Sequence, residues 1–427
     1  MKKEITIEFL ENLYLADKRP WVITFSGGKD STLVLHLVIE LLLKFKRLNK
    51  PLKPTYIVSS DTRIEMPMVK NYLEETLEQI QNFSNTNNLN LYVNLIKPDL
   101  RETFFSLLIG KGYPSPNKWF RWCTDRLKIK PATLFLTELV KKHSSIIMLL
   151  GVRSDESVNR AKSINSRVIN FNNLSMHSNI PNAYMLSPIV NWTTKEVWRF
   201  LRNNPPAWGS YKKLFELYSK GASNIDSDED CNMALNPDSP SCGKSRFGCW
   251  TCTVVEQDRS MEGMIKSGET WMQPLLDYRK LLLHYRDDRD KRLHRRRNGQ
   301  LGLGAFYLEV RKDLLDKLLS IQESKEFKSR GIKLISIDEL KIIQEYWNDD
   351  GDIYNSVYKI AKKYGIKLEN QDINIELDLE NLNQTEAALF MRIYEIERNR
   401  KKSSNRIGIL KEIENRVIDF YKGEFID

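Results

Sequence analysis

The chain has 427 residues, of which 41% are hydrophobic and 29% charged, so it is long enough for two or three domains with substantial cores. Its formal net charge of +10 is compatible with a polyanionic partner. No run of about 18 apolar residues is present to cross a membrane, and the charged N-terminus lacks the apolar centre of a signal peptide. We therefore expect a cytoplasmic protein with no membrane partner. Five cysteines, mostly clustered, favour metal binding or catalysis over a disulfide framework.

The first half of the chain alternates between strand and helix patterns. Apolar runs predict four strands, at 21–25, 55–60, 91–96 and 145–150. The last run is almost wholly apolar, which predicts a central strand. Helical patterns lie between the runs, notably at 66–82 and 131–142. Strands separated by helices predict an α/β fold with a doubly wound, mainly parallel sheet and helices on both faces.

Ligands bind beyond the carboxyl ends of the strands in such sheets, so residues that directly follow a strand are site candidates. A glycine turn follows the first strand and opens an apolar helix; it reads Ser26, Gly27, Gly28, Lys29, Asp30, Ser31. Two glycines let backbone amides approach an anion, and the helix N-terminus adds amides and a positive dipole end. Lys29 supplies a compact positive charge, and Asp30 can cap the helix. The sequence therefore predicts a phosphate-binding turn.

This six-residue turn resembles the pyrophosphate loop (PP-loop) of ATP pyrophosphatases, including PAPS reductase-like enzymes. In that family the loop holds the β- and γ-phosphates of ATP and attack falls on the α-phosphate, which gives AMP and pyrophosphate. The resemblance implies ATP as a cofactor of residues 26–31. An ordinary strand–turn–helix junction is the alternative that the residues alone leave open.

Polar residues also follow the second and fourth strands. Asp61 and Thr62 follow the second strand, where a carboxylate can accept hydrogen bonds from ribose hydroxyls; a solvated loop acid is the alternative. Arg153 and Arg160 follow the fourth strand and can pair with phosphate, although Arg160 could equally be a helix-surface arginine. The acids beside them could hold Mg²⁺ through oxygen ligands.

The cysteines form a second candidate site. Cys242, Cys249 and Cys252 follow a C-x6-C-x2-C pattern, which is typical of metal ligands. A closed site needs a fourth ligand. Cys123, which lies between basic and aromatic residues, is the better candidate, and Cys231 is the alternative. Tetrahedral Zn²⁺ and a 4Fe–4S cluster are both compatible with this spacing.

Four motifs together resemble the DndC family of DNA phosphorothioation proteins, within the PAPS reductase-like group. They are SGGKDS, RWCTDRLKI, GVRSDES and CGKSRFGCWTC, the last of which continues into TVVEQDRSM. The SspD proteins of single-strand phosphorothioation are similar as well. The likeness covers roughly residues 15–310 and implies an ATP pyrophosphatase with a 4Fe–4S cluster that helps to replace a non-bridging phosphate oxygen of DNA by sulfur. It also implies the cluster ligands, Cys123, Cys242, Cys249 and Cys252.

The same resemblance implies three kinds of partner: DNA, a cysteine desulfurase as sulfur source, and other proteins of a phosphorothioation system. Other relatives fit less well. PAPS reductases carry a C-terminal cysteine segment, whereas no cysteine follows Cys252 here. APS reductases carry adjacent cysteines, and ATP sulfurylase small subunits lack the cysteine cluster. A tRNA thiolase shares the loop and cysteines but is usually shorter.

Two classes of function remain open. The first is an enzyme that adenylates a DNA phosphate and passes sulfur to it, with Lys29, Asp30 and Arg153 as catalytic residues and with Mg²⁺ stabilising the leaving pyrophosphate. The second is a DNA-binding module in which ATP acts as a switch and the metal site stabilises the fold. A PP-loop tRNA thiolation enzyme or a PAPS reductase-like enzyme is a further alternative to the first class.

Two segments favour contact with nucleic acid. Residues 279–297 hold nine Lys or Arg and three acidic residues, which predicts phosphate contacts; a solvated amphipathic helix is the alternative. The loop 119–126 interleaves aromatic and basic residues and could stack on a base or on the adenine.

Helical periodicity continues to the end of the chain. Helices are predicted at 314–321, 337–346, 386–400 and 409–421. Ser336 and Glu339 form a capping-box pattern. We expect two domains, a PP-loop domain with the cysteine loop over 1–262 and a basic, mostly helical domain over 263–427.

Overall fold

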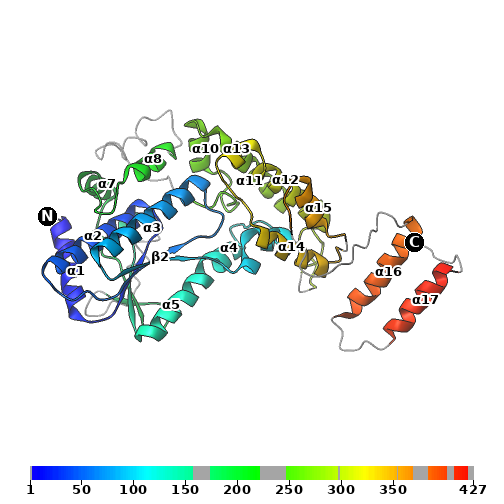
Figure 1. Ribbon diagram of the computed structural model, residues 1–427, viewed down its shortest axis with the longest axis horizontal. Coiled ribbons are helices and arrows are strands. Elements are labelled where there is room, and N and C mark those ends of the chain that lie inside the picture. The colour runs from blue at the N-terminus through cyan, green and yellow to red at the C-terminus, as the bar shows by residue number, and fades with distance from the viewer. Residues whose placement is uncertain are drawn as a thin grey trace. The chain divides into compact units, whose positions relative to one another are not determined.

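The structure is a computed structural model that describes residues 2–156, 174–221, 247–296, 299–352, 354–368, 383–401 and 408–421. Contacts divide the chain into two compact units, whose elements are labelled in Figure 1. Unit 1 comprises residues 1–104, 115–288 and 325–334, and unit 2 comprises residues 105–114, 289–324 and 335–427. The domain boundary expected between residues 262 and 263 lies inside helix α10 (Arg259–Lys266), and unit 1 continues to Asp288.

Unit 1 is built on a six-stranded sheet in the order β3-β2-β1-β4-β6-β5. Its strands are β1 (Trp21–Thr24), β2 (Thr55–Ser60), β3 (Leu91–Ile96), β4 (Ile146–Leu149), β5 (Ser175–Met176) and β6 (Ala183–Leu186). All pairs are parallel except β5 with β6. The structure confirms the first four predicted strands, and β4 lies inside the sheet between β1 and β6, as its apolar sequence predicts. β5 and β6 were not predicted.

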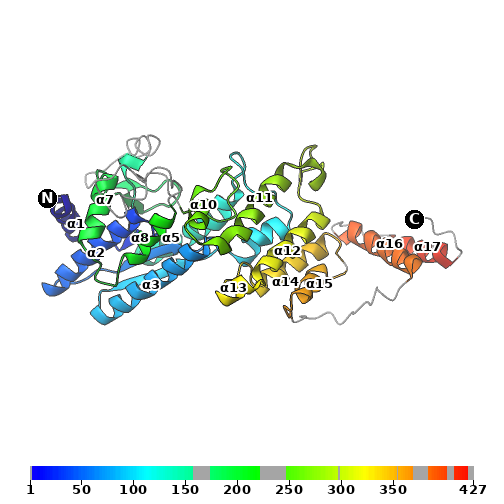
Figure 2. The ribbon, with the colours of Figure 1, turned by 90° about the horizontal axis from the view of Figure 1, so that it is seen from above.

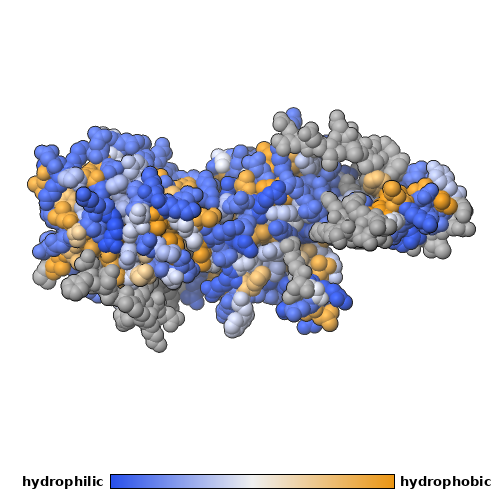
Figure 3. Space-filling view, turned by 90° about the horizontal axis from the view of Figure 1, so that it is seen from below, coloured by the Kyte–Doolittle hydropathy of each residue, from blue (hydrophilic) through white to orange (hydrophobic). Residues whose placement is uncertain are grey.

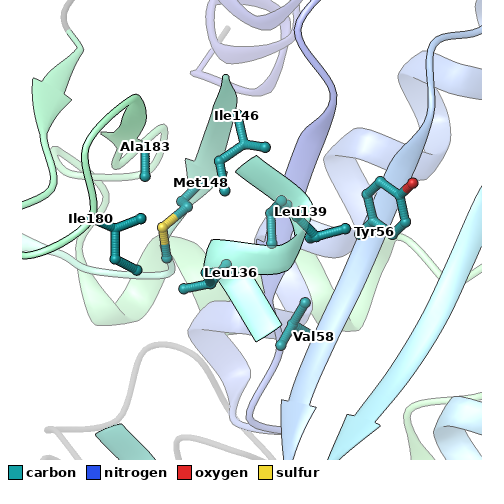
Figure 4. Packing of buried hydrophobic residues seen from close by; sticks show 9 residues of the cluster. Tyr56, Val58, Leu136, Leu139, Ile146, Met148, Ile180 and Ala183 are labelled. Atoms are coloured by element: carbon teal, nitrogen blue, oxygen red, sulfur yellow. The ribbon is translucent and has the colours of Figure 1, made fainter. Parts of the chain in front are cut away.

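Helices cover both faces of this sheet, which confirms the doubly wound fold (Figures 1 and 2). One face is covered by α5 (Lys130–His143): Figure 4 shows Leu136 and Leu139 directed toward Ile146, Met148 and Val58. The other face carries α1 (Lys2–Ala16), α2 (Lys29–Arg47) and α3 (Pro67–Asn87). The ring centres of Trp21 in β1 and Tyr14 in α1 are 5.0 Å apart, and the ring planes lie at 83° to each other.

The register of the sheet aligns the ends of its central strands. Trp21 pairs with Thr55 of β2 on one side and with Ile147 of β4 on the other. The loops that leave β1, β2 and β4 therefore emerge at one edge of the sheet. These loops hold the residues for which the sequence predicts contacts with the nucleotide.

Further helices and helical turns complete unit 1. They are α4 (Trp122–Thr124), the π-helical turn η3 (Asp125–Ile129), α7 (Thr194–Asn203), α8 (Lys212–Lys220), α10, α11 (Gln273–Asp287) and α13 (Lys325–Ser329), with single 3-10 turns η1 (Leu100–Glu102), η4 (Ser154–Glu156) and η5 (Thr270–Met272). Thr193 and Glu196 form a capping box at the start of α7.

Unit 2 is helical. It contains the π-helical turn η2 (Ser106–Gly110), the 3-10 turn η6 (Arg289–Lys291), α12 (Leu308–Gln322), α14 (Ile337–Asp349), α15 (Ser356–Lys363), α16 (Gln384–Lys401) and α17 (Ile409–Tyr421). The predicted C-terminal helices and the Ser336–Glu339 capping box are confirmed. The buried Trp347 of α14 donates to the Ile109 carbonyl of η2 at 2.9 Å.

The face seen in Figure 3 is largely hydrophilic, with hydrophobic residues scattered across it. Among the described helices, none combines the length and the apolar character that crossing a bilayer requires.

Candidate functional site

The turn between β1 and α2 has the backbone of an anion-binding loop. Gly27 adopts a φ of +73°, a left-handed conformation that glycine adopts at little cost. Gly28 is the N-cap of α2, so the first amides of the helix point toward the space in front of the turn. The Ser31 hydroxyl donates to the Gly28 carbonyl at 3.0 Å and accepts from the Ser26 amide at 3.3 Å. Ser26, Gly28 and Ser31 thus hold the turn in one conformation.

Lys29 lies beside Tyr218, which the sequence did not single out. The Lys29 amide donates to the Tyr218 hydroxyl at 3.3 Å, and the ammonium lies 5.7 Å from the centre of the tyrosine ring. The ammonium is also 3.1 Å from the Asp30 carboxylate. Burial raises the pKa of Tyr218, which keeps its hydroxyl neutral. Tyr218 comes from α8, far along the chain, and no local pattern of residues marks it.

Asp30 and Arg153, two predicted catalytic residues, form a buried ion pair. Arg153 Nε donates to Asp30 Oδ1 at 2.7 Å. The other guanidinium nitrogens donate to the Trp192 carbonyl and the Thr194 hydroxyl, both at 3.1 Å, and to Asp155 at 3.3 Å. Arg153 is only 1% exposed. The described geometry therefore directs this guanidinium to protein groups behind the glycine turn.

Gly151 brings the loop after β4 against the start of α2. A Cβ atom built on Gly151 would lie 2.7 Å from the Ser31 amide nitrogen, closer than real Cβ atoms approach such an atom. Only glycine fits here without displacing backbone. The loops that follow β1 and β4 are therefore packed directly on each other.

A cavity of about 570 Å³ opens in front of the glycine turn, within the size range of small-molecule sites. All six residues of the turn line it, as do Gly151 and Val152. The remaining lining includes polar and aromatic residues, among them Glu65, Tyr72, Lys128, Tyr218, Phe247 and Cys249. The cavity thus joins the predicted phosphate loop to one of the predicted metal ligands.

The loop after β2 presents Glu65 to this cavity in place of Asp61. Asp61 is 5% exposed, and its Oδ1 accepts from the Arg63 amide at 2.8 Å. It does not line the cavity, whereas Glu65 does. Thr62 is buried, and its amide and hydroxyl donate to Glu65 Oε1. Burial raises the pKa of Glu65, and its Oε2 has no hydrogen-bond partner among the described residues.

The described cysteines lie near one another. Cys249 forms a β-bridge with Glu65, and its sulfur is 3.7 Å from the Thr62 hydroxyl. The Cys252 amide donates to the Cys249 carbonyl at 3.0 Å. Burial raises the pKa of the Cys249 thiol to about 12 and also raises that of Cys123; negative charge on Cys252 acts on both in the same direction.

Cysteine thiolates are common ligands of zinc and iron–sulfur clusters. Among the described residues, however, no three His, Cys, Asp or Glu side chains lie close enough together to hold a metal ion. Two predicted site residues, Arg160 and Cys242, lie outside the described residues, as does Cys231, the alternative fourth ligand. The set of four cluster ligands therefore stays a prediction.

A family model agrees with the glycine turn and the sheet. The model of the phosphoadenosine phosphosulfate reductase domain matches residues 20–255, more than half of the chain. The chain belongs to this family. The matched region of the reductase-family domain begins just before β1 and ends just after Cys252. It therefore includes the whole sheet and every residue for which we predict contact with ATP or with a metal.

Individual relatives are more distant. An uncharacterized protein of Methanocaldococcus jannaschii is 26% identical over 277 residues, which is 64% of this chain and 45% of that protein. The chain thus spans less than half of that relative's length. Candida glabrata FMN adenylyltransferase, solved with FAD and inorganic pyrophosphate, aligns at 16% identity and a TM-score of 0.30, covering 53% of this chain and 64% of that one. Yeast FAD synthetase in complex with FAD aligns at 16% identity and a TM-score of 0.29, covering 53% of this chain and 65% of that one. Likenesses this weak carry no argument.

Helix α11, just beyond the reductase-family domain, holds the cysteine-bearing segments in place. Arg279 is 1% exposed and donates to the carbonyls of Cys252, Glu256 and Val255. Arg286 donates to the Thr253 carbonyl at 2.9 Å. These bonds fix the chain directly after Cys249 and Cys252.

The contacts of these arginines correct the interpretation of residues 279–297 as a continuous phosphate-binding stripe. Arg279 and Arg286 donate to protein carbonyls, and so does Arg292, which is 9% exposed and lies 2.9 Å from the Gly304 carbonyl. Arg295 and Arg296 are exposed, and Arg297 lies outside the described residues. Burial of a guanidinium among carbonyls depends on the three-dimensional path of the chain, which the number of basic residues does not reveal.

Proposed function

We propose that this protein is an ATP pyrophosphatase that activates a DNA backbone phosphate for replacement of an oxygen by sulfur. The observation that carries the proposal is one cavity lined both by the complete glycine turn and by Cys249. The turn offers amides and Lys29 for polyphosphate, and a cysteine beside it suits sulfur chemistry. Membership of the phosphoadenosine phosphosulfate reductase domain family supports this pairing of nucleotide and sulfur.

The glycine turn binds the β- and γ-phosphates of ATP through the amides at the start of α2 and through Lys29. Arg153 holds Asp30, and Asp30 orients the Lys29 ammonium. A non-bridging oxygen of the DNA phosphate then attacks the α-phosphorus, and pyrophosphate leaves with the electron pair of the broken bond. Lys29 and a Mg²⁺ ion that accompanies ATP stabilise the charge that develops on it. A sulfur nucleophile displaces AMP from the adenylated phosphate.

Cys123, Cys242, Cys249 and Cys252 would hold a 4Fe–4S cluster. The thiol donors of Cys249 and Cys252, and the place of Cys249 in the lining of the nucleotide cavity, support this assignment. When bound, the cluster would supply iron-bound sulfide beside the nucleotide cavity. A cysteine desulfurase and other phosphorothioation proteins would deliver sulfur and DNA.

Product analysis tests the proposed reaction. The protein should convert ATP to AMP and pyrophosphate, and Lys29→Ala should remove most of this activity, at least roughly a hundredfold, because the charge at the leaving group is lost. Lys212→Ala is the matched control, since Lys212 is 82% exposed on α8 and should be silent. ADP and phosphate as the only products would refute the proposal.

Metal analysis tests the cysteine assignment. Protein purified without oxygen should be brown and hold about four irons per chain. Serine in place of any of Cys123, Cys242, Cys249 and Cys252 should bleach it, whereas Cys231→Ser should not. Colourless protein with stoichiometric zinc would overturn the cluster but leave the ATP reaction standing.

A further inference from the structure

An exposed aromatic turn lies just before Cys123. Trp119 is 94% exposed and Phe120 is 46% exposed, whereas the other tryptophans of the chain are buried. The Asn117 side chain accepts from the amides of Trp119 and Phe120, each at 2.8 Å. This side-chain turn fixes the backbone, so the indole is held outward although almost nothing covers it.

The turn stands on a rigid base. On one side, the Pro116 carbonyl accepts from the Thr253 hydroxyl at 2.7 Å and from Arg286 at 3.1 Å. On the other side, Trp122 is 7% exposed and stacks on Phe104, with ring centres 5.3 Å apart and planes at 21°. A displayed ring on a fixed base binds with little loss of conformational entropy, which favours a role in recognition.

The charges around Trp119 fit a polyanion. Lys118 and Arg121 flank the two rings and are exposed, and no acidic residue occurs from Asn117 to Thr124. No residue of this stretch lines the nucleotide cavity. The turn therefore does not belong to the cavity proposed for ATP, and an aromatic face with cations beside it suits a nucleic-acid base and its flanking phosphates.

We propose that residues 117–121, the Trp119 turn, form a stacking platform for one unpaired base of a polynucleotide, with Lys118 and Arg121 on the adjoining phosphates. The inference deepens the proposed function, on which it rests for the identity of the acceptor, by assigning a single-stranded or locally opened substrate. Because the turn leads directly into Cys123, a strand held there runs past the cysteine-bearing segment.

The test measures binding of a short oligodeoxythymidylate and of an abasic oligomer with the same number of phosphates, by fluorescence anisotropy without ATP. Trp119→Ala should weaken oligodeoxythymidylate binding roughly tenfold, within the range that base–aromatic stacking provides, and Trp119→Phe should retain most of it. On the abasic oligomer Trp119→Ala should have no effect. Leu134→Ala, which also truncates an exposed apolar side chain (59%), is the matched control and should bind as wild type.

Equal binding by wild type and Trp119→Ala would overturn the platform and leave a protein partner as the occupant of the turn. An equal reduction on both oligomers would overturn it too, because stacking needs a base. The ATP reaction is measured separately. If Trp119→Ala weakens oligodeoxythymidylate binding but the wild type makes no AMP, the stacking platform stands and the proposed function is refuted.

Discussion

The glycine turn and helix α11 both carry positive charge, but they direct it to different places. Lys29 lines the cavity in front of the turn, and its ammonium lies 3.1 Å from the Asp30 carboxylate. Arg279 is buried, and its guanidinium donates to three backbone carbonyls next to the cysteines. In the proposed function, positive charge serves ligand binding in the first region, whereas in the second region it positions a loop. The number of basic residues in a segment therefore does not measure its capacity for phosphate.

The largest expected effect is on the free energy of unfolding, when the carbonyl contacts of Arg279 in α11 are removed. Arg279→Met leaves the carbonyls of Cys252, Val255 and Glu256 without their donor, so the free energy of unfolding should fall by about 4 kcal/mol. Lys280→Met removes an exposed cation from the next position and should change it by less than about 0.5 kcal/mol. Urea unfolding of both variants decides the point. Equal stabilities would mean that the buried bonds of Arg279 do not hold the loop.

The ion pair behind the glycine turn gives a similar but smaller effect. Arg153→Met leaves the largely buried Asp30 carboxylate with Lys29 in place of two cationic partners, and should cost about 3 kcal/mol of stability. Asp30→Asn in the same chain removes the carboxylate charge that Arg153 no longer compensates, so the double variant should be less destabilised than the sum of the single variants, by about 1–3 kcal/mol. Strict additivity in a double-mutant cycle would show that the pair is not coupled.

Some of these features were predictable from local sequence and others were not. The glycine turn was predictable because its conformation depends on its own backbone, at Gly27 and Gly28. Tyr218 reaches Lys29 from a distant helix, and no local pattern indicates such a contact. Glu65 and Asp61 are four residues apart, and only the path of the loop decides which of them lines the cavity.

The strands show the same limit. β1 to β4 are runs of apolar residues, and their periodicity was sufficient to find them. β6 is the short sequence Ala183–Leu186 and β5 has two residues, so their pairing with each other and with β4 is a tertiary event. The contacts of Arg279 and Arg286 in α11 with backbone carbonyls also depend on the tertiary structure.

In helix α2, which begins at the glycine turn, His36 makes the free energy of unfolding depend on pH. His36 is 5% exposed, and its Nδ1 lies 2.6 Å from the Tyr211 hydroxyl. Burial lowers the pKa of His36 to about 4, against the opposing influence of Glu40. A histidine with a lowered pKa contributes stability above its unfolded value, near 6.5, and that stability is lost as the pH falls toward 4.

Between pH 7 and pH 5 the wild type should therefore lose about 2 kcal/mol through His36. Urea unfolding at the two pH values measures this decrease, which His36→Gln should abolish. His284→Gln, at an exposed position of α11, should retain it. An unchanged pH dependence in His36→Gln would contradict the assignment.

The smallest effect concerns the exposed end of the basic segment. Arg295→Glu with Arg296→Glu should lower DNA affinity and flatten the plot of log affinity against log salt, by roughly 0.7–0.9 for each phosphate that the variant no longer neutralises. Lys212→Glu with Lys213→Glu makes the same change of charge at two other exposed positions and serves as the control. Equal slopes in the two double variants would mean that Arg295 and Arg296 do not contact phosphate.

The central claim is that the glycine turn directs attack to the α-phosphorus of ATP. ATP that carries oxygen-18 in the bridge between the α- and β-phosphorus atoms tests this claim directly, by mass spectrometry of the products. Attack at the α-phosphorus breaks its bond to the bridging oxygen, so the account predicts labelled pyrophosphate and unlabelled AMP. Label retained in AMP would place the attack at the β-phosphorus and would contradict the account.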